Sequence, residues 1–169
     1  ILSLSDLKLV DNYEAQLILC KIAEEINKDF VFDNFYNQSS FLIKDFNNVE
    51  SYMINPDKLF YKLSNINEIE NWSLNEDNLS DNQENFIKNY KYIGDLFSKF
   101  KRILKDQKKG ISGMLYRDVA EKKINYLENE NEVYFIGLNA LSKSEEQIIN
   151  YIVEEKKGGV FVDADDHYV

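Results

Sequence analysis

The chain has 169 residues, of which 44% are hydrophobic and 14% aromatic, so it is long enough to bury the core of one domain. Its net charge of −10 opposes tight, unaided binding to nucleic acid, and its single proline and six glycines argue against a β-sandwich and for long helices. One cysteine excludes an internal disulfide and is typical of the reducing cytosol, and no apolar run reaches the roughly 20 residues that span a membrane.

Capping residues and apolar repeats predict three helices in the first part of the chain. Asp11 and Glu14 stand at the spacing of a capping box, and apolar residues then recur at helical period, so a first helix begins there. Cys20 lies on this helix among apolar residues, which favours a core position over a reactive one. A second helix is expected over about residues 33–52. Asn55 followed by Pro56 predicts the cap and the first residue of a third, short helix.

Two further helices are expected in the middle of the chain. The polar stretch 66–79 predicts a loop, and Ser80 then opens the longest helix, which should continue to about residue 108 and end at Gly110. Another helix should start at Ser112. The inner face of the longest helix is expected to carry Phe86, Tyr90, Ile93, Phe97, Phe100 and Leu104.

The pattern changes after Asn131, where a strand, a helix and a second strand follow one another. The strands are expected at 133–136 and 160–163 and the helix over about 142–156. This order over about thirty residues is typical of a βαβ unit, whose strands are parallel and whose crossover is right-handed. The predicted fold class is therefore mainly α with a small parallel β-sheet, divided into a helical block, 1–130, and a βαβ segment, 131–169.

Acidic residues gather directly after the second predicted strand. Asp163, Asp165 and Asp166 lie at the strand end, where open α/β sheets place ligands. Asp163 and Asp165 have an i, i+2 spacing that can hold a hard cation, as in a metal-dependent phosphoryl- or glycosyl-transfer enzyme. The alternative is a solvated acidic turn, in which His167, the only histidine, is a turn residue.

A basic run lies near the end of the longest predicted helix. Its five candidate contacts to DNA phosphates are Lys99, Lys101, Arg102, Lys105 and Lys109. Phenylalanines interleave the run, and an aromatic ring can stack on a base. Helical spacing places those rings on the buried stripe instead, which favours a structural role. The sequence contains no GxxxxGK[ST], GxGxxG, HExxH or CxxC motif.

Three segments resemble a known family: SGMLYRDVAE (112–121), VYFIGLNALSKSEEQIINYI (133–152) and GVFVDADDHYV (159–169). They are similar to the inactivated superfamily-one (UvrD-like) helicase portion of Bacteroidetes AddB-like proteins, long chains with a PD-(D/E)XK nuclease domain near the C terminus. The resemblance covers essentially the whole chain and is most specific from Gly110 onward. The chain begins without methionine and stops within an apolar stretch, so we expect it to be a piece of such a longer protein.

The resemblance implies a helicase frame that lacks its chemistry. Ile136 stands where the family's magnesium-binding aspartate belongs, Gly137 where the water-activating glutamate belongs, and Asn139 at the neighbouring glutamine. The acidic turn is similar to motif III, with degenerate positions at Asp163, Asp165 and His167. An aliphatic side chain and a glycine cannot bind magnesium or polarise water, so no nucleotide, metal or other cofactor is implied. The helical block would correspond to the end of a 1A-like region and a 1B-like insertion.

The function that the resemblance implies is a non-catalytic scaffold of a helicase–nuclease subunit in DNA double-strand break repair and recombination. The module would guide DNA to the fused nuclease, in the cytoplasm, beside a motor-helicase partner subunit. With a net charge of −10, the isolated chain should bind DNA weakly, if at all, and no membrane contact is expected. Two alternatives stay open: a metal-dependent enzyme that uses Asp163 and Asp165, and a plain helical interaction module.

Overall fold

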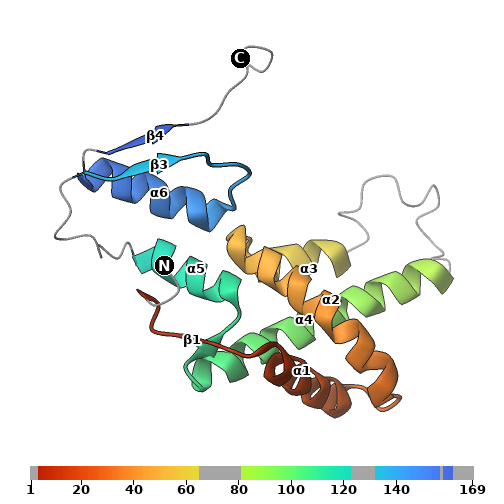
Figure 1. Ribbon diagram of the computed structural model, residues 1–169. Helices are drawn as coiled ribbons and strands as arrows, with labels where there is room; N and C mark the ends of the chain where they lie inside the picture. The colour runs from red at the N-terminus through yellow and green to blue at the C-terminus, as the bar shows by residue number, and fades with distance from the viewer. Residues whose placement is uncertain (1–3, 65–80, 123–131, 157, 162–169) are drawn as a thin grey trace, which may run out of the picture.

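The computed structural model describes residues 4–64, 81–122, 132–156 and 158–161 (Figure 1). These residues are mainly helical and contain six helices and two small parallel sheets. The helices are α1 Asn12–Ile26, α2 Phe32–Ser51, α3 Pro56–Ser64, α4 Asp81–Asp106, α5 Ser112–Lys122 and α6 Lys143–Lys156. The strands are β1 Lys8–Leu9, β2 Lys109–Gly110, β3 Tyr134–Ile136 and β4 Gly159–Phe161. The predicted class, mainly α with a small parallel sheet, is confirmed.

Two of the predicted helix starts are fixed by side-chain caps. The Asp11 side chain accepts a hydrogen bond from the Tyr13 backbone N–H at 2.9 Å, which begins α1. The Asn55 side chain accepts one from the Lys58 N–H at 2.9 Å, and Pro56 is the first residue of α3. Both caps satisfy N–H groups that the first turn of a helix leaves without a backbone partner. The starts of α1 and α3 are therefore confirmed.

The predicted end of the longest helix at Gly110 is wrong. α4 ends at Asp106, and Lys108, with φ of 54°, turns the chain. Gly110 instead belongs to β2, which pairs in parallel with β1. A Cβ at Gly110 would lie 2.8 Å from a methyl carbon of Leu115, so a larger residue at this position would require the Leu115 side chain to move. The N-terminal segment is therefore held by pairing with β2. Each strand has only two residues, too few to show a strand pattern in the sequence.

A hydrophobic core fills the space between α1, α2 and α4. The ring of Phe46 on α2 packs against Phe97 and Phe100 on α4, with centroids 4.8 Å and 6.0 Å apart. Each ring is at most 2% exposed, and burying one such side chain stabilises the fold by roughly 1.5–3 kcal/mol. Leu104 is also fully buried, which confirms this part of the predicted stripe. Cys20 is buried as predicted, and burial raises the pKa of its thiol.

α5 lies between this core and the last part of the described chain (Figure 1). Its first half contributes Met114 to the helical core, and its second half contributes Val119 to a separate cluster with Ile148 and Ile152 of α6. All four side chains are at most 5% exposed. Packing on α5 therefore joins α6 and its strands to the helical block. The predicted division near residue 131 falls outside the described residues and stays a prediction.

β3 and β4 are parallel neighbours, and α6 connects them and covers one face of their sheet (Figure 1). Ile136 lies opposite Phe161 in the register. A Cβ at Gly158 would lie 1.7 Å from the Val133 carbonyl oxygen, so glycine is required where the chain enters β4. The predicted strand–helix–strand arrangement with parallel strands is therefore confirmed.

Several predictions fall on residues outside the described ranges. They are the loop at 66–79, the cap at Ser80, and the acidic turn after β4. Of the helices within the described ranges, none combines the length and the apolar character needed to cross a bilayer.

Candidate functional site

The carboxyl ends of β3 and β4 lie side by side. The Gly137 N–H donates to the Phe161 carbonyl oxygen at 3.1 Å, and Gly137 has φ of 72°, a left-handed conformation that glycine adopts without strain. Ile136 is 76% exposed, and Asn139 is also exposed. The positions that the resemblance aligns with helicase motif II therefore present an aliphatic side chain, bare backbone and an amide. None of these groups supplies a carboxylate ligand for magnesium or a general base.

The second group of predicted site residues, Asp163, Asp165 and His167, lies outside the described residues. Within the described part of the chain, no three His, Cys, Asp or Glu side chains come together in a group that can hold a metal ion. The acidic turn, as a metal site or as a degenerate motif III, therefore stays a prediction.

Ser142 and Glu145 fix the start of α6, shortly after the turn that ends β3. The Ser142 N–H and hydroxyl donate to the Glu145 carboxylate at 2.8 and 2.7 Å, and the Glu145 N–H lies 3.4 Å from the serine oxygen. This reciprocal pattern is a capping box, which satisfies two backbone donors at once. The helix between the strands is therefore fixed by its own sequence as well as by packing.

The five basic residues predicted to contact DNA lie on α4 and β2 and divide into two groups. Arg102 and Lys105 are exposed, three positions apart on α4, and have no carboxylate within 4.0 Å among the described residues. The other three are paired with glutamates of α1 or α2: Lys99 with Glu25, Lys101 with Glu50, and Lys109 with Glu14. A paired cation must leave its carboxylate before it can bind a phosphate. Arg102 and Lys105 are therefore the most available members of the run.

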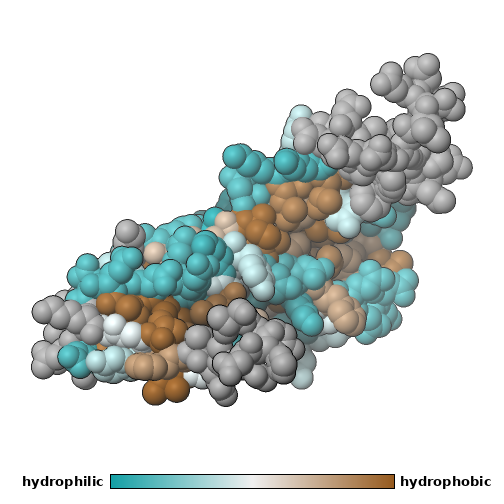
Figure 2. Space-filling model, turned by 90° about the horizontal axis from the view of Figure 1, so that it is seen from above, coloured by the Kyte–Doolittle hydropathy of each residue, from teal (hydrophilic) through white to brown (hydrophobic). Residues whose placement is uncertain are grey.

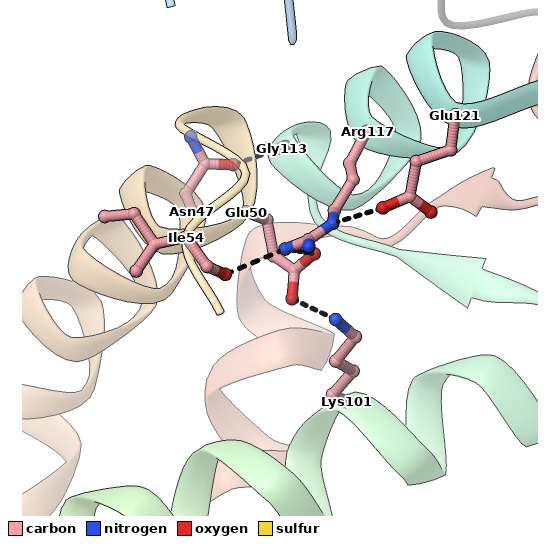
Figure 3. A network of polar contacts seen from close by, with 7 residues as sticks. All are labelled: Asn47, Glu50, Ile54, Lys101, Gly113, Arg117 and Glu121. Atoms are coloured by element: carbon pink, nitrogen blue, oxygen red, sulfur yellow. Dashed lines mark hydrogen bonds and ion pairs between the residues drawn. The ribbon is translucent and has the colours of Figure 1, made fainter. Parts of the chain in front are cut away.

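Glu50 is a buried carboxylate, 1% exposed, where α2, α4 and α5 meet (Figure 3). Lys101 binds one of its oxygens, and Arg117 Nη1 lies 3.4 Å from the other. Burying a lone carboxylate costs several kcal/mol, and these two cations offset that cost. Arg117 also donates to the Ile54 carbonyl at 3.0 Å and to Glu121 at 2.8 Å. One guanidinium therefore connects the chain just after α2 to α5.

A small pocket of about 150 Å³ borders this network. The charged residues that line it are Lys101, Lys105, Arg117, Glu50, Asp118 and Glu121. The pocket lining carries three positive and three negative charges, so its net charge gives no preference for an anion, and the paired groups hold the helices together.

Asn47 on α2 holds the first turn of α5. Its side-chain oxygen accepts a hydrogen bond from the Ser112 hydroxyl at 2.8 Å. The same oxygen accepts one from the Gly113 N–H at 2.6 Å (Figure 3). A Cβ at Gly113 would lie 2.4 Å from the backbone carbonyl oxygen of Asn47. The two helices approach so closely here that only glycine fits.

Asp118 on α5 holds the N-terminal segment. It accepts hydrogen bonds from the Ser5 hydroxyl at 2.7 Å and the Asp6 N–H at 3.2 Å, and Lys122 Nζ lies 2.8 Å from its other oxygen. Burial acts to raise the pKa of Asp118, but the hydrogen bonds from Lys122, Ser5 and Asp6 outweigh it. The pKa of the carboxyl is therefore lowered from its ordinary value.

Asn47, Glu50 and Asp118 are not among the site residues predicted from the sequence. For Glu50 a local signal existed, since it follows Phe46 by four positions and therefore lies on the buried face of α2. A charge on a buried face requires a partner. That partner, Lys101, is 51 positions away in the sequence, and no local pattern indicates it.

Comparisons with known proteins find no match for this chain. No protein-family model matches it, and no curated protein or solved structure matches it significantly. The resemblance to AddB-like proteins therefore rests on the quoted segments alone.

Proposed function

We propose that the chain is a non-catalytic, helicase-like scaffold module of a helicase–nuclease subunit that acts in DNA double-strand break repair and recombination. The observation that carries the proposal is the β3–α6–β4 unit, because its parallel strands and helical crossover are the frame that the resemblance implies. At the carboxyl end of β3, where an active helicase needs two carboxylates, the chain has Ile136 and Gly137.

The electrostatics support a role in guiding DNA rather than holding it tightly. A net charge of −10 repels a polyanion, and the paired lysines of the basic run hold helices together. Arg102 and Lys105 remain as two available cations on α4. In this proposal, the neighbouring nuclease domain and a motor-helicase partner subunit supply the chemistry and most of the DNA affinity.

An interaction module is the second candidate, and the open face of the β3–β4 sheet favours it. Tyr134, Ile136 and Phe161 are 52%, 76% and 58% exposed. Figure 2 shows an apolar area at the end of the molecule where these strands lie. Parallel sheets are normally covered on both faces, so this face is suited to packing against further protein.

Measurements of ATP binding and turnover, of DNA binding, and of divalent-ion-dependent activity separate the candidates. Isothermal titration calorimetry with ATP and Mg²⁺ should give no binding, and no turnover should occur above buffer; micromolar affinity would overturn the non-catalytic proposal. Fluorescence anisotropy with labelled single-stranded DNA should give a dissociation constant no tighter than roughly 10⁻⁴–10⁻⁶ M, weakening with salt. Complete absence of DNA binding at low salt would favour the interaction module. A divalent-ion-dependent activity that is lost in Asp165→Asn would favour the metal-dependent enzyme.

A further inference from the structure

A groove of about 560 Å³ lies between α1, α2 and the start of α5, away from the β3–β4 sheet. Its lining includes the buried side chains of Val10 and Ile111, the half-buried Ile43, and Tyr13, which is 70% exposed. Volume and lining both match small-molecule sites, which are largely apolar, measure about 300–1,000 Å³, and use a few polar groups to orient the ligand.

α2 supplies half of the polar residues that line this groove; the others are Asn12 and Gln16 on α1 and Ser112 on α5. Ser40, Lys44 and Asn47 follow one another at i, i+4 and i+7, on the same side of the helix as Ile43. Lys44 is the one charged residue in the lining, and no carboxylate lies within 4.0 Å of it among the described residues. The Asn47 oxygen is occupied by the start of α5, and its amide nitrogen has no acceptor among the described residues.

We propose that this groove binds a small organic monocarboxylate with an apolar body. The carboxylate pairs with the Lys44 ammonium and accepts a hydrogen bond from one flanking group, the Ser40 hydroxyl or the Asn47 amide, while the apolar body covers the aliphatic lining. A single lysine neutralises a single negative charge, and the net charge of −10 repels polyanions such as nucleotides. The site does not depend on the proposed scaffold function, because it uses neither the β3–β4 sheet nor the basic run.

The test uses the whole chain, labelled with ¹⁵N, and a matched pair of probes: 3-phenylpropionate and its neutral amide, 3-phenylpropionamide. The acid should shift amide signals around Tyr13 and residues 40–47 and saturate in about the millimolar range or tighter. The neutral amide should bind about tenfold more weakly, because it lacks the charge that pairs with lysine. Equal affinity for the two probes, or shifts that map elsewhere, would overturn the proposal, as would no saturable shift at all.

Three variants test the residues themselves. Lys44→Gln should weaken the acid about tenfold and leave the neutral amide unchanged. Lys62→Gln, at an exposed position on α3, removes the same charge away from the groove and should change neither affinity. Ser40→Trp, at an exposed position, fills the groove and should abolish binding of both probes while the rest of the spectrum is retained. Unchanged acid affinity in Lys44→Gln or in Ser40→Trp contradicts the site.

Discussion

Glu50 on α2 and Lys101 on α4 form an ion pair across 51 positions of sequence, and Glu50 is only 1% exposed. Because both Lys101 and Arg117 compensate this carboxylate, its removal leaves two part-buried cations without their acceptor. We expect Glu50→Ala to lower the free energy of unfolding by roughly 3–5 kcal/mol, measured by urea denaturation. Lys101→Met should cost less, because Arg117 still faces the carboxylate.

Glu121→Gln is the matched control for this network. Its carboxylate also binds Arg117, but the side chain is 54% exposed, so solvent screens the pair. The free energy of unfolding should change by less than about 1 kcal/mol. If Glu50→Ala and Glu121→Gln had equal effects, the buried network would not be a main source of stability.

Asp118→Asn tests whether the stability that Asp118 gives by holding the N-terminal segment depends on pH. The folded-state pKa of Asp118 is lowered from 3.8, so its ionised form stabilises the fold fully above that value. This contribution is lost as pH falls through the lower, folded-state pKa. At about pH 7 the variant should be less stable than the parent chain by roughly 1.5–3 kcal/mol, and the difference should shrink below pH 3.8. Urea denaturation across this range measures it, and a difference independent of pH would rule out the carboxylate charge as its cause.

Gly113→Ala tests the close approach of α2 and α5. The new methyl group would lie 2.4 Å from the Asn47 carbonyl oxygen, and backbone cannot move away as a flexible side chain can. Overpacking of this kind costs roughly 1–3 kcal/mol, seen as a lower urea midpoint. Gly159→Ala is the control, because its methyl group would meet the nearest side-chain carbon at 3.5 Å, an ordinary contact. Equal effects of the two substitutions would contradict the steric explanation.

The parts of the fold that local sequence predicts are those whose causes are local. Asp11 and Asn55 stand next to the helices that they cap, and the strands on either side of α6 are separated by one helix. Contacts between distant segments left no such signal. Ser5 binds Asp118 across 113 positions, and β1 pairs with β2 through two residues on each side, too few to show a period.

The candidate site shows the same division. The absence of acids at Ile136 and Gly137 can be read from the sequence, since it depends only on which residues end and follow β3. The basic run can also be read from the sequence, but the ion pairs that its lysines form with glutamates of other helices cannot. The helical period of α4 separates its buried positions from its exposed ones. The glutamates that form ion pairs with Lys101 and Lys109, however, come from α2 and α1. Whether a cation of the run is free to bind a phosphate therefore depends on how the helices pack.

Arg102→Gln combined with Lys105→Gln tests the DNA surface on α4. If these two cations contact phosphates, the slope of log affinity for single-stranded DNA against log salt should fall by about 1.4, since each contact contributes roughly 0.7. The control is Lys58→Gln combined with Lys62→Gln, which removes two exposed charges from α3 and should leave the slope nearly unchanged. Lys101→Gln should lower stability but leave DNA affinity close to that of the parent chain, because Glu50 already binds this lysine. Fluorescence anisotropy at several salt concentrations measures the DNA affinity of the three variants, and urea denaturation measures the stability of Lys101→Gln. Equal slopes for both double variants would mean that α4 provides no specific DNA contact.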